Sequence, residues 1–135
     1  MRNYEDEEIN VNLLVGKTIS AINKHDDSIV FICSNGDTFE AYHMQDCCEK
    51  VSIYDVSGDL QSLVGETITF ARENKISQEW PHDVPKPEYL ESFTWTTHTF
   101  KTAKNTVTVR WLGESNGYYS ESVYFCRTHK PISLD

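Results

Sequence analysis

The chain has 135 residues, the size of one domain with a core of its own. It carries 12 basic and 21 acidic residues, for a formal net charge of −9. Affinity for a nucleic-acid backbone or an anionic membrane surface comes largely from Lys and Arg, so this balance argues against both partners. An acidic protein can still bind a small anion in a local basic pocket, or the basic surface of a protein that normally holds nucleic acid.

The first residues of the chain are acidic. Residues 1–12 include the run Glu5-Asp6-Glu7-Glu8 and predict a polar end prone to fraying, followed by a single β-rich domain over residues 13–135. The sequence contains no apolar run long enough for a transmembrane helix and no export-signal pattern. We therefore expect a cytoplasmic protein without a membrane partner.

The four cysteines are interpreted on that basis. In a cytoplasmic protein, the thiols of Cys33, Cys47, Cys48 and Cys126 are expected to be reduced. Cys33 and Cys126 lie within apolar strand patterns, so we expect both to be buried as small hydrophobic residues.

A short sequence occurs twice. Residues 14–19 read Leu-Val-Gly-Lys-Thr-Ile, and residues 63–68 read Leu-Val-Gly-Glu-Thr-Ile. In each copy an apolar segment meets a glycine, which supplies a turn conformation closed to other residues, and Thr-Ile then opens a strand. Either the chain contains two related openings, or chance and common turn chemistry produced the match. Two copies do not make a solenoid.

Residues with high β-propensity recur along the chain and predict strands rather than long helices. The fold class expected is mainly β, with antiparallel strands in one strongly bent or doubled sheet and one or two short helices. A short helix is expected within residues 57–63, with Ser57 or Asp59 as its cap. The expected strands cover residues 18–23, 28–33, 38–42, 51–56, 67–73, 92–102, 106–112 and 118–127.

Two turns and one long loop are predicted between these strands. The pairs Asn35-Gly36 and Asn116-Gly117 fit two-residue type I′ hairpin turns, in which both central residues take φ > 0. A loop is expected at about residues 74–90, because its three prolines remove ladder donors and fix φ. A loop this long in a compact domain is often functional, and Trp80 should anchor it or form a contact surface.

Alternation assigns faces to the last two strands. Val107, Val109 and Trp111 share one face, and Val123 and Phe125 are their expected partners on the next strand. These residues are predicted to face the core.

Arg110 then lies on the opposite face, which has little apolar content. A guanidinium there needs a carboxylate partner or a ligand anion. Aromatic rings beside a single Arg suit a nucleobase or a ribose phosphate. The competing interpretation is an ordinary salt bridge, for instance with Glu121 or Asp46. The other polar or aromatic residues expected near this face are Trp95, His98, Asn116, Tyr118, Tyr119 and Ser120.

Residues 43–49, His-Met-Gln-Asp-Cys-Cys-Glu, bring more reactive side chains together than any other stretch. Three interpretations compete. Cys47 or Cys48 could be a nucleophile with His43 as its base, although Asp46 and Glu49 would shift a thiol pKa in the wrong direction. His43 and the cysteines could bind zinc, although adjacent cysteines rarely ligate one ion. The third interpretation is a tight structural turn in which the carboxylates accept hydrogen bonds, and it is the one we favour.

No other pattern points to catalysis. The sequence lacks a phosphate-cradling Gly loop, a Gly-x-Ser-x-Gly elbow and a paired-carboxylate hydrolase signature. We therefore expect no enzyme activity, no catalytic residue, no cofactor and no metal.

Several motifs stand out together along the chain. They are Leu14-Val15-Gly16-Lys17, His43-x-Gln45-Asp46-Cys47-Cys48-Glu49-x-Val51, Gly58-Asp59-Leu60-x-x-Leu63-x-Gly65, Trp95, Arg110-Trp111 and Ser115-Asn116-Gly117-Tyr118-Tyr119-Ser120-Glu121-x-Val123. These motifs resemble a family of small uncharacterised proteins of bacteriophages and prophages. The resemblance covers residues 13–125 and implies a phage-encoded protein that acts in the host cytoplasm, with residues 46–49 and 116–121 marking one shared site. By size and β content the chain is also broadly similar to the anti-Thoeris sponge proteins, an analogy of architecture.

Two functions are therefore expected to compete. In the first, the protein is a non-catalytic binder that sequesters a small anionic nucleotide-type signal. In the second, it is an acidic inhibitor that blocks a nucleic-acid site on a host defence protein. Self-association into a homo-oligomer stays open, and a zinc- or cysteine-dependent enzyme is a lesser alternative. The candidate ligand-binding residues are Arg110, His43, Asp46, Glu49, Trp95, Asn116, Tyr118 and Ser120.

Overall fold

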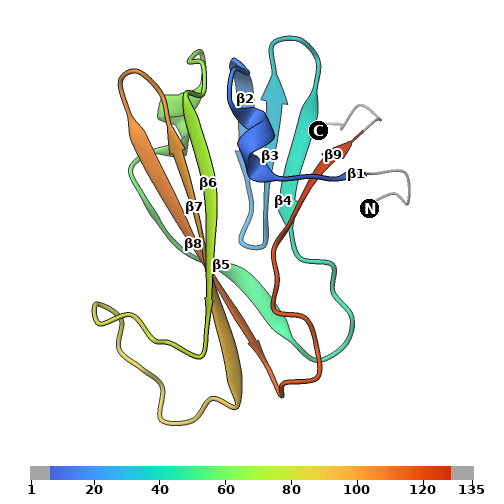
Figure 1. The fold of residues 1–135 in the computed structure, drawn as a ribbon, viewed down its shortest axis with the longest axis vertical. Coiled ribbons are helices and arrows are strands. Elements are labelled where there is room, and N and C mark those ends of the chain that lie inside the picture. The colour runs from blue at the N-terminus through green and yellow to red at the C-terminus, as the bar shows by residue number, and fades with distance from the viewer. Residues whose placement is uncertain (1–6, 129–135) are drawn as a thin grey trace.

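The computed structural model describes residues 7–128, which form two antiparallel β-sheets that share one core (Figure 1). The first sheet has the strand order β1-β9-β4-β3-β2, and the second has the order β5-β8-β7-β6. The strands are β1 (Glu7–Glu8), β2 (Ile19–Lys24), β3 (Ser28–Cys33), β4 (Thr38–Tyr42), β5 (Lys50–Ser57), β6 (Phe70–Ser77), β7 (Ser92–Lys101), β8 (Thr106–Ser115) and β9 (Tyr124–Thr128). The expectation of a doubled antiparallel sheet is confirmed.

The repeated sequence corresponds to a repeated structure. Each copy begins at the last residue of a four-residue 3-10 helix, η1 (Val11–Leu14) or η2 (Leu60–Leu63). Asn10 and Asp59 cap these helices in the same way, each accepting a hydrogen bond from the backbone N–H two residues later. Gly16 and Gly65 then take positive φ, at 88° and 86°.

The two copies also bond each other reciprocally. The N–H of Gly16 donates to the carbonyl of Ile68 at 2.8 Å, and the equivalent N–H of Gly65 donates to the carbonyl of Ile19 at 2.7 Å. The hydroxyls of Thr18 and Thr67, which occupy equivalent positions in the two copies, are 2.7 Å apart. Such an exchange of equivalent bonds is what a local two-fold axis produces, so the repeated sequence is also a structural repeat.

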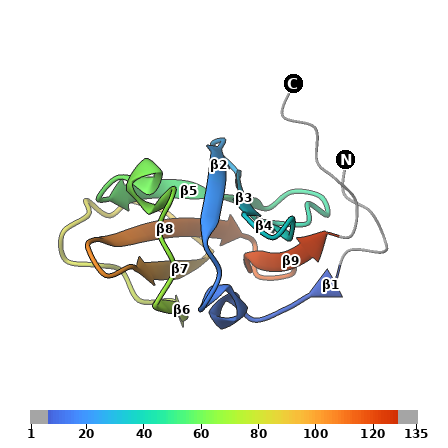
Figure 2. The ribbon, with the colours of Figure 1, turned by 90° about the horizontal axis from the view of Figure 1, so that it is seen from above.

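The repeat extends to the topology of the whole chain (Figure 2). The strands β2, β3 and β4 form a meander, after which β5 leaves to pair with β8 of the other sheet. The strands β6, β7 and β8 form the equivalent meander, after which β9 returns to pair with β4. Each half of the chain therefore completes the sheet of the other half. We call residues 43–49 the first crossover and residues 116–123 the second crossover.

The shared core follows the alternation predicted for the last strands. Val107, Val109 and Trp111 are fully buried between the sheets, and Val123 and Phe125 belong to the same cluster. Their pairing was predicted wrongly, however. Strand β9 is hydrogen-bonded to β4 and β1, not to β8, so Val123 and Phe125 reach the core from the opposite sheet.

Both Asn-Gly turns differ from the prediction. The N–H of Gly36 donates to the carbonyl of Cys33, and the N–H of Cys33 donates to the carbonyl of Asp37, which makes a three-residue loop. Only Gly36 has positive φ within it, as in a type I turn followed by a left-handed glycine, so this is not a type I′ turn. Asn116 and Gly117 do not join a hairpin, because β8 and β9 belong to different sheets.

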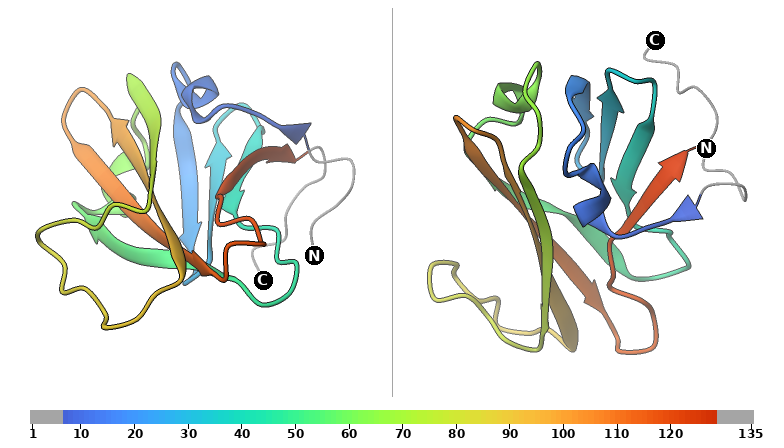
Figure 3. Two further views of the ribbon diagram at one scale, coloured as in Figure 1. Left: turned by 60° about the horizontal axis from the view of Figure 1, so that its bottom comes forward. Right: turned by 45° about the horizontal axis from the view of Figure 1, so that its top comes forward.

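The proline-containing loop begins later than position 74. Strand β6 pairs with β7 as far as Ser77, so the irregular loop covers residues 78–91. It packs on the outer face of the second sheet, where a small apolar cluster includes Trp80, Val84 and Trp95. Trp80 anchors the loop on β7, because its ring stands edge-on to Phe93 at 5.1 Å and to Trp95 at 5.2 Å. Within the loop, its indole N–H donates to the carbonyl of Val84 at 2.9 Å. Figure 3 shows this loop on the side of the second sheet that faces away from the first.

The helical segments described between residues 7 and 128 are short. Neither η1 nor η2 has the length or apolar character needed to cross a lipid bilayer.

Candidate functional site

The candidate residues divide between two ends of the second sheet. Arg110 and Trp95 line a pocket on its outer face, beneath the 78–91 loop. His43, Asp46 and Glu49 belong to the first crossover, which precedes β5. No residue of the first crossover lines the Arg110 pocket.

Arg110 is placed on the outer face by strand register. On β8 it is opposite Thr97, whereas Val107, Val109 and Trp111 point inward. Asp55, its neighbour on β5, accepts two hydrogen bonds from the guanidinium, from Nε at 2.9 Å and from Nη2 at 2.6 Å. Asp83 from the loop accepts a hydrogen bond from Nη1 at 3.1 Å, and its other carboxylate oxygen lies 3.1 Å from Nη2 as an ion pair. The predicted salt bridge exists, but its partners are Asp55 and Asp83 rather than Glu121 or Asp46.

Arg110 and its two partners, Asp55 and Asp83, stabilise one another in their charged forms. The hydrogen bonds to Asp55 and Asp83, in that order, raise the pKa of Arg110 above its ordinary value. The guanidinium in turn lowers the pKa of the Asp83 carboxyl. Asp83 is nevertheless the loosely held partner, because 67% of its side chain is exposed, compared with 42% for Asp55.

Aromatic rings surround the guanidinium. Its central carbon lies 5.6 Å from the ring centroids of both Tyr54 and Trp95, within the range of cation–π attraction. Trp80 stands edge-on to Trp95 at 5.2 Å. The pocket has a volume of about 550 Å³ and is lined by Asn74, Ile76, Glu79, Trp80, Pro81, His82, Trp95, Thr97 and Arg110.

Trp95 carries a buried donor that is unused. Trp95 is 5% exposed, and its indole N–H has no hydrogen-bond partner among the described residues. A buried N–H without an acceptor costs free energy, about 1–3 kcal/mol in mutational data. The pocket itself offers aromatic faces and a cation.

His98 does not belong to this pocket, contrary to expectation. The register of β7 places it on the inner face, opposite Glu73 of β6. Its Nε2 lies 2.9 Å from a carboxylate oxygen of Glu73, and the contact lowers the pKa of that carboxyl.

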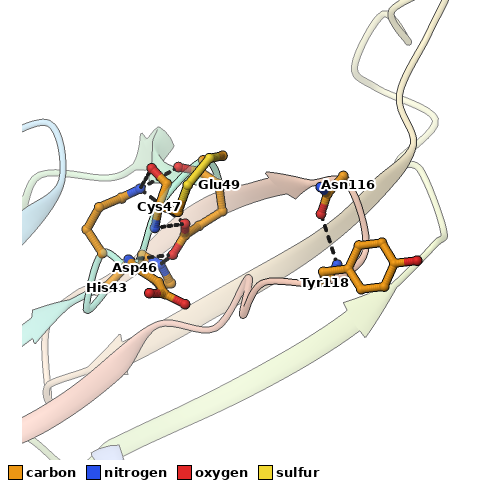
Figure 4. The surroundings of a disulfide bond; sticks show 8 residues. His43, Asp46, Cys47, Glu49, Asn116 and Tyr118 are labelled. Carbon is orange, nitrogen blue, oxygen red and sulfur yellow. Dashed lines mark hydrogen bonds and ion pairs between the residues drawn. A yellow bond between two sulfur atoms is a disulfide. The ribbon is translucent and has the colours of Figure 1, made fainter.

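The first crossover contains a disulfide between Cys47 and Cys48 (Figure 4). The expectation of reduced thiols is therefore wrong for this pair, while Cys33 and Cys126 are thiols and are buried as predicted. In the disulfide form neither sulfur of the pair can act as a thiolate nucleophile or as a zinc thiolate ligand. Among residues 7–128, no cluster of His, Cys, Asp or Glu is arranged to hold a metal ion.

Glu49 organises this turn. Its side chain is 0% exposed, and its carboxylate accepts hydrogen bonds from the backbone N–H groups of Asp46 and Cys47, both at 2.9 Å. His43 Nε2 lies 2.7 Å from the same carboxylate, while His43 Nδ1 lies 2.7 Å from the carbonyl oxygen of Ser122. Because both partners of the ring are acceptors, both ring nitrogens must donate, and His43 is an imidazolium.

These contacts change the pKa of the Glu49 carboxyl. The hydrogen bond from His43 outweighs burial and, with the backbone N–H groups, lowers the pKa of Glu49 from 4.5 to about 2. Every polar group of the pair is satisfied, which is typical of a structural centre. The interpretation of residues 43–49 as a tight turn, with carboxylates accepting hydrogen bonds, therefore fits the geometry.

The remaining candidates lie on the second crossover. Asn116 accepts a hydrogen bond from the N–H of Tyr118, and Tyr118 itself is 89% exposed (Figure 4). Ser120 accepts a hydrogen bond from the N–H of Ser122. Asn116 also lines a groove of about 340 Å³ beside Cys48. These residues lie next to the first crossover, not around Arg110.

The hypothesis of a single site is therefore wrong. Lys50, directly after Glu49, pairs with Glu114 of β8, four residues from Arg110. That separation corresponds to roughly 13 Å along a strand. The resemblance implies one shared site for residues 46–49 and 116–121. The two segments are adjacent, since Cys48 and Asn116 line one groove, but Arg110 and Trp95 form a separate pocket.

Sequence reasoning missed the two partners of Arg110. The alternation of the strand predicted at 51–56 could have placed Asp55 on one face, but not opposite Arg110. A bulge between Ile53 and Asp55 shifts the register of β5 against β8, and no sequence pattern announced it. Asp83 reaches the guanidinium only through the path of the loop.

The fold and the pocket together define a class: a duplicated, strand-exchanged β protein with an aromatic pocket on one outer face. Residues 12–125 match a family model described as a domain of unknown function, DUF7448, and the chain belongs to that family. No curated protein and no solved structure matches the chain.

Proposed function

We propose that this protein is a non-catalytic binder that sequesters a small anionic, nucleotide-type molecule in the Arg110 pocket. The proposal includes a phage-encoded protein that acts against host defence in the host cytoplasm, comparable in role to the anti-Thoeris sponges. The observation that carries the proposal is the arrangement around Arg110. The carboxylate of Asp55 is fixed on its strand, whereas a ligand anion can replace the carboxylate of Asp83.

The pocket suits the two parts of a nucleotide. Its volume of about 550 Å³ falls within the roughly 300–1,000 Å³ of small-molecule sites. A base can stack on or beside Trp80 and Trp95. A phosphate can take bonds from Arg110 in place of Asp83, since Asp83 occupies that position from an exposed loop.

Calorimetry with cyclic nucleotides, mononucleotides and ADP-ribose derivatives tests this proposal. Arg110→Ala should abolish binding, whereas Asp83→Asn should strengthen it, because the competing charge is removed. Arg72→Ala is the matched control, since it makes the same change of charge on β6 and does not line the pocket. The absence of binding by both the wild type and Asp83→Asn, or equal binding by Arg110→Ala, would overturn the proposal.

A second candidate function rests on the net charge of −9. In it, the acidic surface occupies a nucleic-acid site on a host defence protein. Association of this kind weakens steeply with salt, because exposed charges are screened over roughly 8 Å at physiological ionic strength. Capture from host lysate at low and high salt separates the two candidates: a retained small molecule without a protein supports the pocket, and a salt-sensitive protein partner supports the inhibitor.

A further inference from the structure

The disulfide of the first crossover is the one reactive group that the proposed pocket does not use. Both Cys47 and Cys48 are exposed to solvent. The other two cysteines are 3% and 5% exposed, and burial raises the pKa of the Cys33 thiol to about 11, which makes it a poor nucleophile. Thiol chemistry at the surface of this protein is thus confined to one pair of adjacent residues.

We propose that Cys47–Cys48 is a redox site that exchanges two electrons with a dithiol, such as a dithiol oxidoreductase of the cell. This proposal does not rest on the ligand pocket, and the two sites share no lining residue. The pair is a dithiol where the surroundings are reducing and a disulfide where they are oxidising.

The hydrogen bonds around Glu49 make such a cycle reversible. The Glu49 carboxylate holds the N–H groups of Asp46 and Cys47 without involving sulfur. The amide of Gln45 adds bonds to the carbonyls of Cys47, at 3.3 Å, and Glu49, at 2.7 Å. These bonds shape the turn independently of the disulfide. Reduction therefore leaves the two thiols side by side, where they can be oxidised again.

The groove beside Cys48 gives the incoming thiol an approach. Cys48 lines this groove together with Lys50, Tyr89 and Asn116, whereas Cys47 does not. A thiolate of the reductant attacks the sulfur of Cys48, forms a mixed disulfide and breaks the Cys47–Cys48 bond. Cys47 leaves as a thiolate and takes a proton from water.

The second thiol of the reductant completes the exchange. As a thiolate it attacks its own partner sulfur in the mixed disulfide, which releases Cys48 as a thiolate that is then protonated. The protein gains two electrons and two protons, and the reductant leaves as an intramolecular disulfide. A monothiol cannot finish in this way, and the neighbouring Cys47 thiolate reverses its attack. The pair therefore selects dithiols over monothiols.

Alkylation of the native protein tests the accessibility of the pair. Before reduction, iodoacetamide should modify none of the four cysteines, and after brief treatment with a dithiol it should modify Cys47 and Cys48 only. Cys33 and Cys126 are internal controls that should react only after unfolding. Modification of the pair without reductant would show that no disulfide forms, and resistance of the pair until unfolding would show that it is closed to thiols. Either result overturns the proposal.

Two single variants test the order of attack. When the proteins are first reduced and then treated with glutathione disulfide, Cys47→Ser should accumulate about tenfold more mixed disulfide than the wild type, because the resolving thiol is missing. Cys48→Ser should form its mixed disulfide more slowly, since Cys47 lies outside the groove. Equal rates in the two variants would overturn the assignment of Cys48 as the attacked sulfur. A wild type that retains glutathione as strongly as Cys47→Ser would overturn the two-electron exchange itself.

Discussion

Residues 43–49 and residues 116–123 occupy equivalent places in the two halves of the chain, and each carries the backbone from one sheet to the other. Each crossover contains one glutamate that accepts several hydrogen bonds. Glu49 is bound within its own turn, by the His43 imidazolium and by backbone N–H groups. Glu121 is bound by neutral hydroxyls of the second sheet, from Thr94 at 2.7 Å and Ser115 at 2.5 Å.

The difference shows two ways to fix a connection between sheets. The first crossover is a closed local structure with a buried ion pair and a disulfide. The second crossover lies against the sheet so closely that a Cβ on Gly113 would stand 2.6 Å from the Glu121 carbonyl oxygen. The stability of the first crossover should therefore depend on charge, and that of the second crossover on contact with β7 and β8.

The largest expected effect is the loss of the His43 imidazolium. His43→Ala leaves Glu49 buried without its cation and should cost about 3–5 kcal/mol of the free energy of unfolding, the usual cost of breaking a buried pair. Urea denaturation measures this. His25→Ala is the matched control, because His25 is exposed and its loss should stay within about 0.5 kcal/mol. Equal losses in the two variants would mean that the first crossover does not depend on the ion pair.

Acid should weaken the same centre. The pKa of Glu49 is lowered from 4.5 to about 2 on folding, so its contribution to stability is complete above pH 4.5 and is lost as the pH falls towards 2. Urea denaturation at a series of pH values should show this decline in the wild type. Glu49→Gln, which has no charge to lose, should be less stable at neutral pH and decline less. An unchanged slope in the variant would contradict the assignment.

The smallest expected effect concerns the second crossover. Ser115→Ala removes one hydroxyl from the Glu121 carboxylate and the acceptor of the Gly117 N–H, and should cost about 1 kcal/mol. Urea denaturation gives the loss, and hydrogen exchange at Gly117 should become faster. Ser34→Ala in an exposed turn is the control and should change neither. A larger loss than that of His43→Ala would reverse the comparison of the two crossovers.

The sequence by itself determined the class of fold and the faces of strand β8. Alternation along a strand is a local property with a period of two, so the inward positions of Val107, Val109 and Trp111 could be predicted without knowing the neighbours. The outward position of Arg110 followed from the same rule. The repeated segment at residues 14–19 and 63–68 likewise marked two equivalent openings, each with a glycine at positive φ.

Tertiary structure alone decided which strands pair and which side chains meet. Because each half gives its last strand to the other sheet, β9 pairs with β4, and neither the Asn116-Gly117 turn nor the order of strands predicted this. Asp55 reaches Arg110 through a bulge and Asp83 through a long loop, so both partners depend on contacts between distant residues. The adjacency of Cys47 and Cys48 was visible in the sequence, but the disulfide and the Glu49 centre depend on the fold. One turn carries both the disulfide and the N–H groups that bond Glu49, and the second crossover supplies the Ser122 carbonyl that holds His43.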